Sequence, residues 1–312
     1  MNFFVLLAAL FLGQFQLLSS RKNLSAWLSL YVDFFPRHFN AGEQRHGKFS
    51  WLLAVLLLVA GVVVLSLLLH SLHPIVSFAF NVFVLYLTLG FRHIHFYFTD
   101  IRQELRAKNL DEARQLLTVW RGIPSQGLSE EEVARISIEQ ALLASHRNMF
   151  GVMVWFVIFS LVGLNGVAGA LLYRLGQLCA ERWSAKEVGA AEVFGKFAQR
   201  AFVWLEWLPA RITALIFAIV GNFEDTMFCW RTQAANWSNK EEGIVLASGA
   251  GSLGVRLGMA IPQDGLSLDR TELGMGDDAD TDFMQSTTGL IWRSLVFMLI
   301  AVLLFSLAGL LS

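Results

Sequence analysis

Charged residues and cysteine are both scarce in this sequence. Asp, Glu, Lys and Arg together make up 16% of the 312 residues, whereas soluble domains usually carry about 25%. The two cysteines, Cys179 and Cys229, lie far apart, with no second Cys or His at the spacing of metal ligands. A zinc site and a disulfide framework are therefore not expected. The net charge of −1 averages apolar and charged segments, so it gives no reason to expect a nucleic-acid partner.

Long apolar runs dominate the chain instead. A helix needs about 20 apolar residues to cross a bilayer, and five runs reach or approach that length: 1–20, 51–72, 74–91, 150–173 and 290–311. A sixth run, 201–221, carries Glu206, Pro209 and Arg211, so it either crosses the membrane or forms a broken or interfacial helix. We predict an all-α integral membrane protein with five to six transmembrane helices and two extramembrane segments of helices and loops.

Basic residues predict which segments face the cytoplasm. Residues 21–50 carry five Lys/Arg and residues 92–148 carry eight, so the positive-inside rule places both in the cytoplasm. The N-terminus is then expected in the periplasm and the protein in the bacterial inner membrane. Residues 174–200 also carry five Lys/Arg, which conflicts with a simple crossing by 150–173. Either this loop lies outside despite its charge, or the glycine-rich run enters the membrane and returns.

The expected organisation has five parts: N-terminal transmembrane helices with a basic cytoplasmic loop at 21–50 (1–91), a cytoplasmic amphipathic helical hairpin (92–148), central membrane helices (149–221), a cytoplasmic Gly/Asp-rich segment (222–289) and a C-terminal transmembrane helix (290–312). In the hairpin, Asn109 and Ser129 each precede a glutamate by three residues, the spacing of a helix N-cap. The aspartates of residues 277–282 lack the glycine and the final carboxylate of an EF-hand loop, so no metal site is expected.

A glycine motif, Gly249-x-Gly251-x-x-Gly254, has the spacing of a dinucleotide-binding turn. That fold requires a strand before the motif and a long helix after it. The preceding "GIVLAS" could form a strand, but Gly258 and Pro262 interrupt the segment that follows. The glycines are therefore expected to permit close helix approach or a tight turn. A sharper alternative is that they hold a phosphate together with Arg256.

Arg211 is the strongest single functional candidate in the sequence. An arginine at membrane depth is costly without a partner, and such residues often mark binding sites. Its structural alternatives are a pair with Glu206 or an anchor at the membrane interface.

Several motifs resemble the CobD/CbiB family of membrane adenosylcobinamide-phosphate synthases. The segment "SGAGSLGVRLG" is similar to the family's "AGALGVRLG". "NLDEARQLLTVWRGIPSQGLSEEEVARISIEQALL", "WLPARI" and "CWRTQAANWS" match further family elements in the same order, so the resemblance covers residues 75–261. It implies a membrane enzyme that joins aminopropanol, or aminopropanol phosphate, to adenosylcobyric acid with ATP and Mg²⁺. The substrate-binding candidates that follow are Arg211, Trp230, Arg231, Gly249, Gly251, Gly254, Arg256 and Gly258.

The sequence also departs from this family at polar positions. The family's "AEN…DG" pattern is here "SHRNMFG", its "NTLD" is "YRLG", and its "PNSGW…E" segment is "NKEEGIVLAS". Loss of metal-holding carboxylates resembles the related AmpE proteins of β-lactamase regulation. We therefore expect a non-catalytic protein of envelope signalling, with no catalytic residues, no cofactor and a cytoplasmic signalling or amidase partner. The alternative is an active synthase of cobalamin biosynthesis. The oligomeric state is not predicted.

Overall fold

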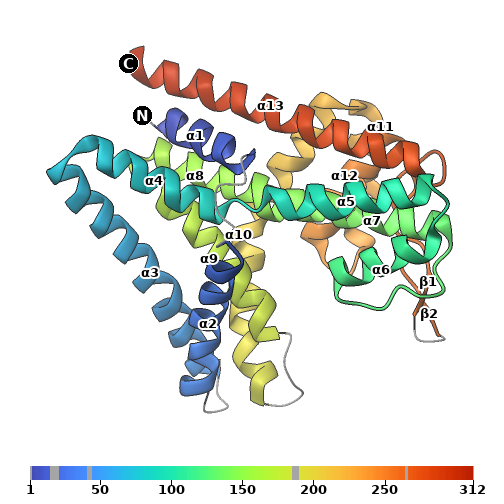
Figure 1. Ribbon diagram of the computed structural model, residues 1–312, viewed down its shortest axis with the longest axis horizontal. Coiled ribbons are helices and arrows are strands. Elements are labelled where there is room, and N and C mark those ends of the chain that lie inside the picture. The colour runs from blue at the N-terminus through green and yellow to red at the C-terminus, as the bar shows by residue number, and fades with distance from the viewer. Residues whose placement is uncertain (1, 15–20, 41–43, 185–189, 264–265, 312) are drawn as a thin grey trace. The chain divides into compact units, whose positions relative to one another are not determined.

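The computed structural model describes residues 2–14, 21–40, 44–184, 190–263 and 266–311 (Figure 1). The described chain is almost entirely helical, which confirms the predicted all-α class. Strands β1 (Ile261–Gln263) and β2 (Leu266–Leu268) form one antiparallel hairpin. The chain folds into two compact units, each assembled from separate stretches of sequence. Unit 1 contains Met1–Leu89, Gly151–Pro209 and Gly309–Ser312, and unit 2 contains Gly90–Phe150 and Ala210–Ala308.

Four helical stretches among the described residues are long and apolar enough to cross a bilayer: Arg45–Leu72, Glu130–Leu161, Val193–Val220 and Thr281–Ala308. They belong to α3 (Gln44–Leu72), to the run from α7 (Glu130–Ser145) through η1 (His146–Phe150) to α8 (Gly151–Leu161), to α10 (Ala190–Val220) and to α13 (Thr281–Leu311). The ambiguous run 201–221 is thus part of a long helix. The apolar helices α1 (Asn2–Gln14) and α4 (Pro74–Thr88) are shorter.

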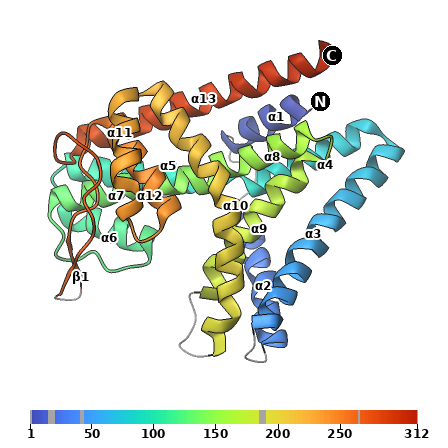
Figure 2. The ribbon, with the colours of Figure 1, turned by 180° about the vertical axis from the view of Figure 1, so that it is seen from behind.

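The predicted single span at 150–173 is wrong, because a turn divides it into two helices. Helix α8 ends at Leu161, Gly163 adopts a φ of 77°, and α9 runs over Gly166–Ser184. The Asn165 side chain accepts the N–H of Val167 at 2.9 Å and so begins α9. The two helices lie side by side (Figure 2). A Cβ at Gly169 would approach the Trp155 carbonyl oxygen at 2.3 Å, so glycine permits this contact. Of the two alternatives for this run, the structure favours the returning one.

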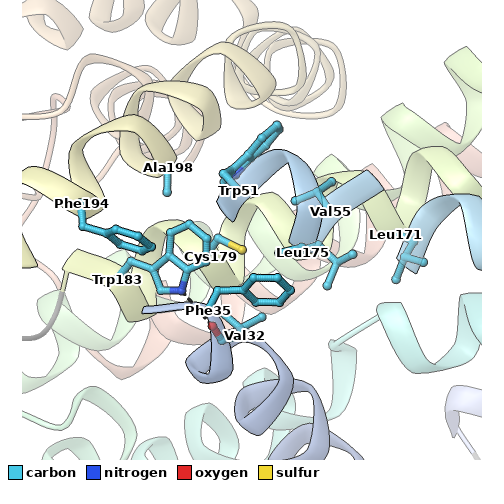
Figure 3. Close-up of a cluster of buried hydrophobic side chains, with 11 residues drawn as sticks. Val32, Phe35, Trp51, Val55, Leu171, Leu175, Cys179, Trp183, Phe194 and Ala198 are labelled. Carbon is cyan, nitrogen blue, oxygen red and sulfur yellow. Dashed lines mark hydrogen bonds between the residues drawn. The ribbon is translucent and has the colours of Figure 1, made fainter. Parts of the chain in front are cut away.

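Residues 21–50, expected to form a basic loop, contain helix α2 (Arg21–Phe39) and the start of α3. Helix α2 supplies Val32 and Phe35 to a buried apolar cluster within unit 1 (Figure 3). The cluster also holds Trp183, whose indole N–H donates to the Val32 carbonyl at 3.0 Å. Cys179 lies in it as a buried free thiol. An amphipathic helix that buries one face is easily mistaken for a polar loop, because its other face is charged.

Pro209 removes one backbone hydrogen bond of α10, and a side chain of unit 1 supplies the missing donor. Proline has no N–H, so the carbonyl four residues earlier, that of Leu205, loses its helical donor. The indole N–H of Trp155 donates to this carbonyl at 2.9 Å. The helix therefore continues through the proline.

Unit 2 contains α5 (Phe91–Arg106), α6 (Leu110–Arg121), α7, α11 (Phe223–Gln233), η2 (Ala234–Asn236), α12 (Lys240–Leu253) and most of α13. The predicted hairpin over 92–148 is thus extended by a third helix, α5. The Ser129 N-cap forms with a full capping box through Glu132. Asn109 also precedes its helix, but its side chain donates to Glu104 at 2.9 Å instead of capping.

Candidate functional site

Buried ionic residues gather on α7 and α12 of unit 2. Glu139 on α7 is 5% exposed and Glu241 on α12 is 4% exposed. A buried carboxylate is costly unless it is paired and hydrogen-bonded, and both residues have such partners. Each of these two carboxylates lies in a candidate site of its own.

The first site surrounds Glu139. Arg270 donates from Nη1 to Oε2 at 2.7 Å and from Nη2 to Oε1 at 3.1 Å, and the Gly258 N–H donates to Oε1 at 2.9 Å. Arg270 also donates to the carbonyls of Gly258 and Met259 at 2.8 and 3.1 Å. Its guanidinium carbon lies 5.5 Å from the centre of the Trp237 ring. The fork of Arg270 is thus fully engaged in holding the chain at 258–259 onto α7.

The backbone of Gly258 and Met259, which Arg270 holds, has an unusual conformation. Gly258 and Met259 have φ values of 75° and 61°, so two consecutive residues adopt the left-handed region. A Cβ at Gly258 would lie 2.0 Å from the Thr271 carbonyl oxygen, so only glycine fits there. Met259 carries a side chain in a conformation that is uncommon for such residues and costs about 1–2 kcal/mol. Strain of this kind clusters at ligand sites.

Two further arginines belong to the first site, which we call the arginine cluster: Arg121, Arg135, Arg270 and Glu139. Arg135 is 3% exposed and donates to Met259 Sδ at 3.5 Å and to the Ala260 carbonyl at 3.4 Å. Its Nε has no hydrogen-bond partner in the described structure. Burial lowers the pKa of Arg121, while the neighbouring charge of Glu139 raises it and that of Arg270 lowers it.

The second site, which we call the paired carboxylates, consists of Glu241 and Glu242 at the start of α12. Arg211 donates to Glu241 at 2.7 Å, and Arg147 donates to Glu242 at 2.8 Å. Asn239 caps α12 by accepting the N–H of Glu241 at 3.1 Å. Arg147 lies in η1, a turn of π-helix, and such turns often occur at functional sites. His146, also in η1, contacts the Thr213 hydroxyl through Nδ1 at 3.0 Å.

The structure brings only some of the predicted site residues together. Arg211 joins the paired carboxylates, and Gly258 joins the arginine cluster. Trp230 is half-buried and Arg231 is exposed on α11, and Arg256 pairs with Asp278 in the acidic loop before α13.

The glycine motif lies inside α12 and at its end. Gly249 packs on the Leu142 side chain, Gly251 packs on the Asp225 backbone, and Gly254 ends the helix with a φ of 69°. The segment "GIVLAS", which could have formed a strand, is therefore helical. A phosphate is attracted to a helix N-terminus, whereas the carboxyl end of α12 carries partial negative charge.

Sequence reasoning missed most of the ionic residues, namely Arg121, Arg135, Glu139, Arg147, Glu241, Glu242 and Arg270. Glu139 had a signal, because it is a lone acid within the otherwise weakly polar "ISIEQALL". Arg270 had none, since 131 positions separate it from Glu139. Across the described ranges, no three His, Cys, Asp or Glu residues gather as a metal site.

Comparison with known proteins gives one consistent family. A family model described as CobD/Cbib protein matches residues 16–290. The "Cobalamin biosynthesis protein CobD" of Stutzerimonas stutzeri is 32% identical over 87% of each chain. The proteins of the same name from Chromobacterium violaceum and Halalkalibacterium halodurans are 34% and 24% identical, over 65% and 80% of this chain and 63% and 79% of their own. No solved structure matches.

These relatives correct one prediction. The sequence departures predict an AmpE-like protein of envelope signalling, yet the relatives carry the name of a cobalamin biosynthesis protein. The AmpE-like interpretation is wrong. It counted carboxylates by motif position and overlooked Glu139, Glu241 and Glu242, which the fold places beside arginines.

Proposed function

This chain belongs to the CobD/CbiB family, and on that premise we propose that it is a membrane enzyme of cobalamin biosynthesis. In this proposal it condenses the amine of aminopropanol, or of its phosphate ester, with a carboxyl group of adenosylcobyric acid. An amide bond forms and water is removed overall, so ATP is the expected energy source. The observation that carries the proposal is the family match over residues 16–290, which includes every ionic residue of both sites.

The two sites suit anionic and amine substrates. Arginine forks bind carboxylate and phosphate groups in bidentate fashion, and the arginine cluster contains two besides Arg270, whose own fork is engaged with Glu139. Among the paired carboxylates, the Glu242 side chain is 24% exposed while that of Glu241 is 5% exposed. Glu242 is therefore the better placed of the two to take a proton from the substrate ammonium, which must lose one before its nitrogen can attack.

The carboxylates of the two sites do not form a ready ligand set for Mg²⁺. Mg²⁺ is commonly held by one or two carboxylates together with substrate phosphates. Glu139, Glu241 and Glu242 each have an arginine partner. The described residues of the two sites therefore do not fit a preformed metal site.

We also propose a location in the bacterial inner membrane, with the N-terminus in the periplasm. The apolar helices indicate a bilayer environment, and the basic residues of 21–50 and 92–148 support a cytoplasmic location for these segments.

Complementation tests the function. The chain is expressed in a bacterial strain that lacks its own synthase, and corrinoid-dependent growth is scored. We expect growth with the wild-type chain and with Glu224→Gln, which changes an exposed carboxylate on α11. We expect loss with Glu242→Gln. In parallel, purified protein is given aminopropanol phosphate, adenosylcobyric acid and ATP, and the amide is detected by mass spectrometry. A wild-type chain present in the membrane that neither restores growth nor forms the amide would contradict the proposal.

A further inference from the structure

A small cavity lies in unit 1, between helices α2, α9 and α10. Its volume is about 80 Å³, which is several times the space that one water molecule needs and far too little for a whole lipid. Helix α2 contributes Asp33, Pro36, Arg37 and Asn40 to its wall, and α9 contributes Arg182 and Trp183. The arginine cluster and the paired carboxylates both belong to unit 2, so this cavity is separate from them.

Two contacts between α2 and α9 fix the wall of the cavity. Pro36 has no N–H, so the Val32 carbonyl, four residues earlier, loses its helical donor. The indole N–H of Trp183 donates to this carbonyl at 3.0 Å (Figure 3). Asp33 is 9% exposed, and its two oxygens accept from Arg182 at 2.8 and 2.5 Å. The cavity is therefore built by the packing of the chain itself.

The cavity carries a positive charge that its own acid does not balance. The Asp33 carboxylate is matched by Arg182. Arg37 lines the same cavity, is exposed, and has no ion pair with any residue that the structure describes. A guanidinium stays charged and presents a fork that fits phosphate oxygens. The cavity therefore favours an anionic group that reaches it from outside the protein.

An exposed apolar stripe on α2 leads to this arginine. Trp27, Leu30 and Phe34 are between 47% and 61% exposed. Their spacing of three and four residues puts them on one face of the helix, and Arg37 continues that face three residues later. We call Trp27, Leu30 and Phe34 the α2 stripe. An exposed apolar patch of this kind marks a surface for a membrane or a partner.

Helix α3 shows that the α2 stripe lies beside an apolar membrane segment. The Tyr31 hydroxyl, within the same turns of α2, donates to the Ala54 carbonyl of α3 at 2.8 Å. Ala54 belongs to the uncharged run 51–72. Helices α2 and α3 follow each other in the chain and lie side by side (Figure 1), so they run antiparallel. Lipid chains along α3 would therefore also meet the α2 stripe.

The cavity, in contrast, lies beside the charged start of α3. Arg45, His46 and Lys48 precede the uncharged run. A Cβ at Gly47 would lie 2.3 Å from the carbonyl oxygen of Phe194, and Phe194 lines the cavity from α10. The stripe and the cavity thus follow the order of acyl chain and headgroup in a bilayer.

From this arrangement we propose that unit 1 binds one anionic phospholipid. Its phosphate contacts Arg37 at the cavity, and an acyl chain lies along the α2 stripe. Arg182 is the positioning residue, because its fork is engaged with Asp33 and holds α2 in place. Basic residues next to a membrane segment attract anionic lipids in general, and the preformed cavity adds a defined place for one headgroup. This lipid is a bound component of the protein and has no part in the proposed reaction.

Native mass spectrometry of full-length protein in detergent tests the site. The Kd of the first bound lipid is measured for phosphatidylglycerol, which is anionic, and for zwitterionic phosphatidylcholine with the same acyl chains. We expect phosphatidylglycerol to bind about tenfold more tightly or better, as for a contact between charged groups. Arg37→Gln should weaken it roughly fivefold to fiftyfold and leave phosphatidylcholine unchanged. Arg37→Lys should retain part of the affinity.

Two further variants complete the test. The matched control is Arg200→Gln, which removes another exposed arginine of unit 1 that does not line the cavity, and it should bind both lipids as the wild type does. Phe34→Ala should weaken both lipids about threefold to tenfold by removing apolar contact area. Far-UV circular dichroism checks that each variant is folded. Free glycerol 3-phosphate serves as a competitor that has the headgroup chemistry without acyl chains.

Three outcomes would overturn the proposal. Equal affinity of the wild type for the two lipids would refute an anion site. Equal weakening by Arg37→Gln and Arg200→Gln would show attraction to overall charge instead of a defined site. Displacement of the lipid by an equal concentration of glycerol 3-phosphate, with no effect of Phe34→Ala, would assign the cavity to a soluble anion. Because no corrinoid, amine or ATP is present, these results do not depend on the proposed enzyme activity.

Discussion

Replacing Arg270 with methionine should destabilise unit 2 strongly, because it leaves the Glu139 carboxylate buried with a single remaining donor. The change removes two N–H···O bonds to a charged acceptor, at 2.7 and 3.1 Å. Bonds of this kind contribute about 1.5–3 kcal/mol each. Breaking a buried ion pair by removing one partner costs about 3–5 kcal/mol in total, and we expect a loss in that range. The Gly258 N–H, at 2.9 Å, is too weak a partner to prevent it.

The companion variant is Glu139→Gln/Arg270→Met. It removes both charges, so no uncompensated ion stays buried, and the double variant should be more stable than Arg270→Met alone. Such coupling between neighbouring groups is what a double-mutant cycle measures. The free energy of unfolding should be followed by far-UV circular dichroism during denaturation in detergent, because Arg270 stacks on Trp237 and its loss would alter the fluorescence directly. If the double variant loses as much as the two single variants summed, the reasoning about this pair is refuted.

Three further predictions concern the scaffold. Trp155→Phe should lower the free energy of unfolding by about 1–3 kcal/mol, because it leaves the Leu205 carbonyl without a donor. Adding Pro209→Ala to this variant restores a backbone N–H and should recover most of that free energy. No recovery would contradict the assigned role of Trp155. Gly254→Val should lower the amount of folded protein in membranes, whereas Gly254→Asn should not. A Cβ at this position has open space, so only the φ of 69° disfavours valine, and asparagine tolerates that φ. Equal abundance of the two variants would refute this prediction. Burial raises the pKa of Cys229 to about 11. In a Cys179→Ala chain, the Cys229 thiol should therefore stay protonated and unreactive toward maleimide from pH 7 to 9 until the protein is unfolded. Rapid labelling of the folded protein would contradict this prediction, because it would show that the thiol is accessible.

Much of the fold was determined by composition and local pattern alone. An uncharged run as long as 51–72 indicates a membrane helix or a deeply buried one. Within a membrane it must be helical, because the backbone of a span must satisfy its own hydrogen bonds. The capping box at Ser129 and the left-handed glycine at 254 are local devices, and their geometry follows from neighbouring residues. The family was equally accessible, since motifs such as "GVRLG" and "WLPARI" stand in the sequence itself.

The tertiary structure decided where the chain turns and which charges meet. Leu161 and Gly166 are flanked on both sides by apolar residues, so hydropathy could not reveal the turn between α8 and α9. The pairs Glu139–Arg270, Arg147–Glu242 and Arg211–Glu241 join residues 131, 95 and 30 positions apart. A carboxylate has no intrinsic sequence signal for its partner. Its chemistry depends on burial and on the charge that the fold places within a few ångströms, and only the packed chain sets these two quantities.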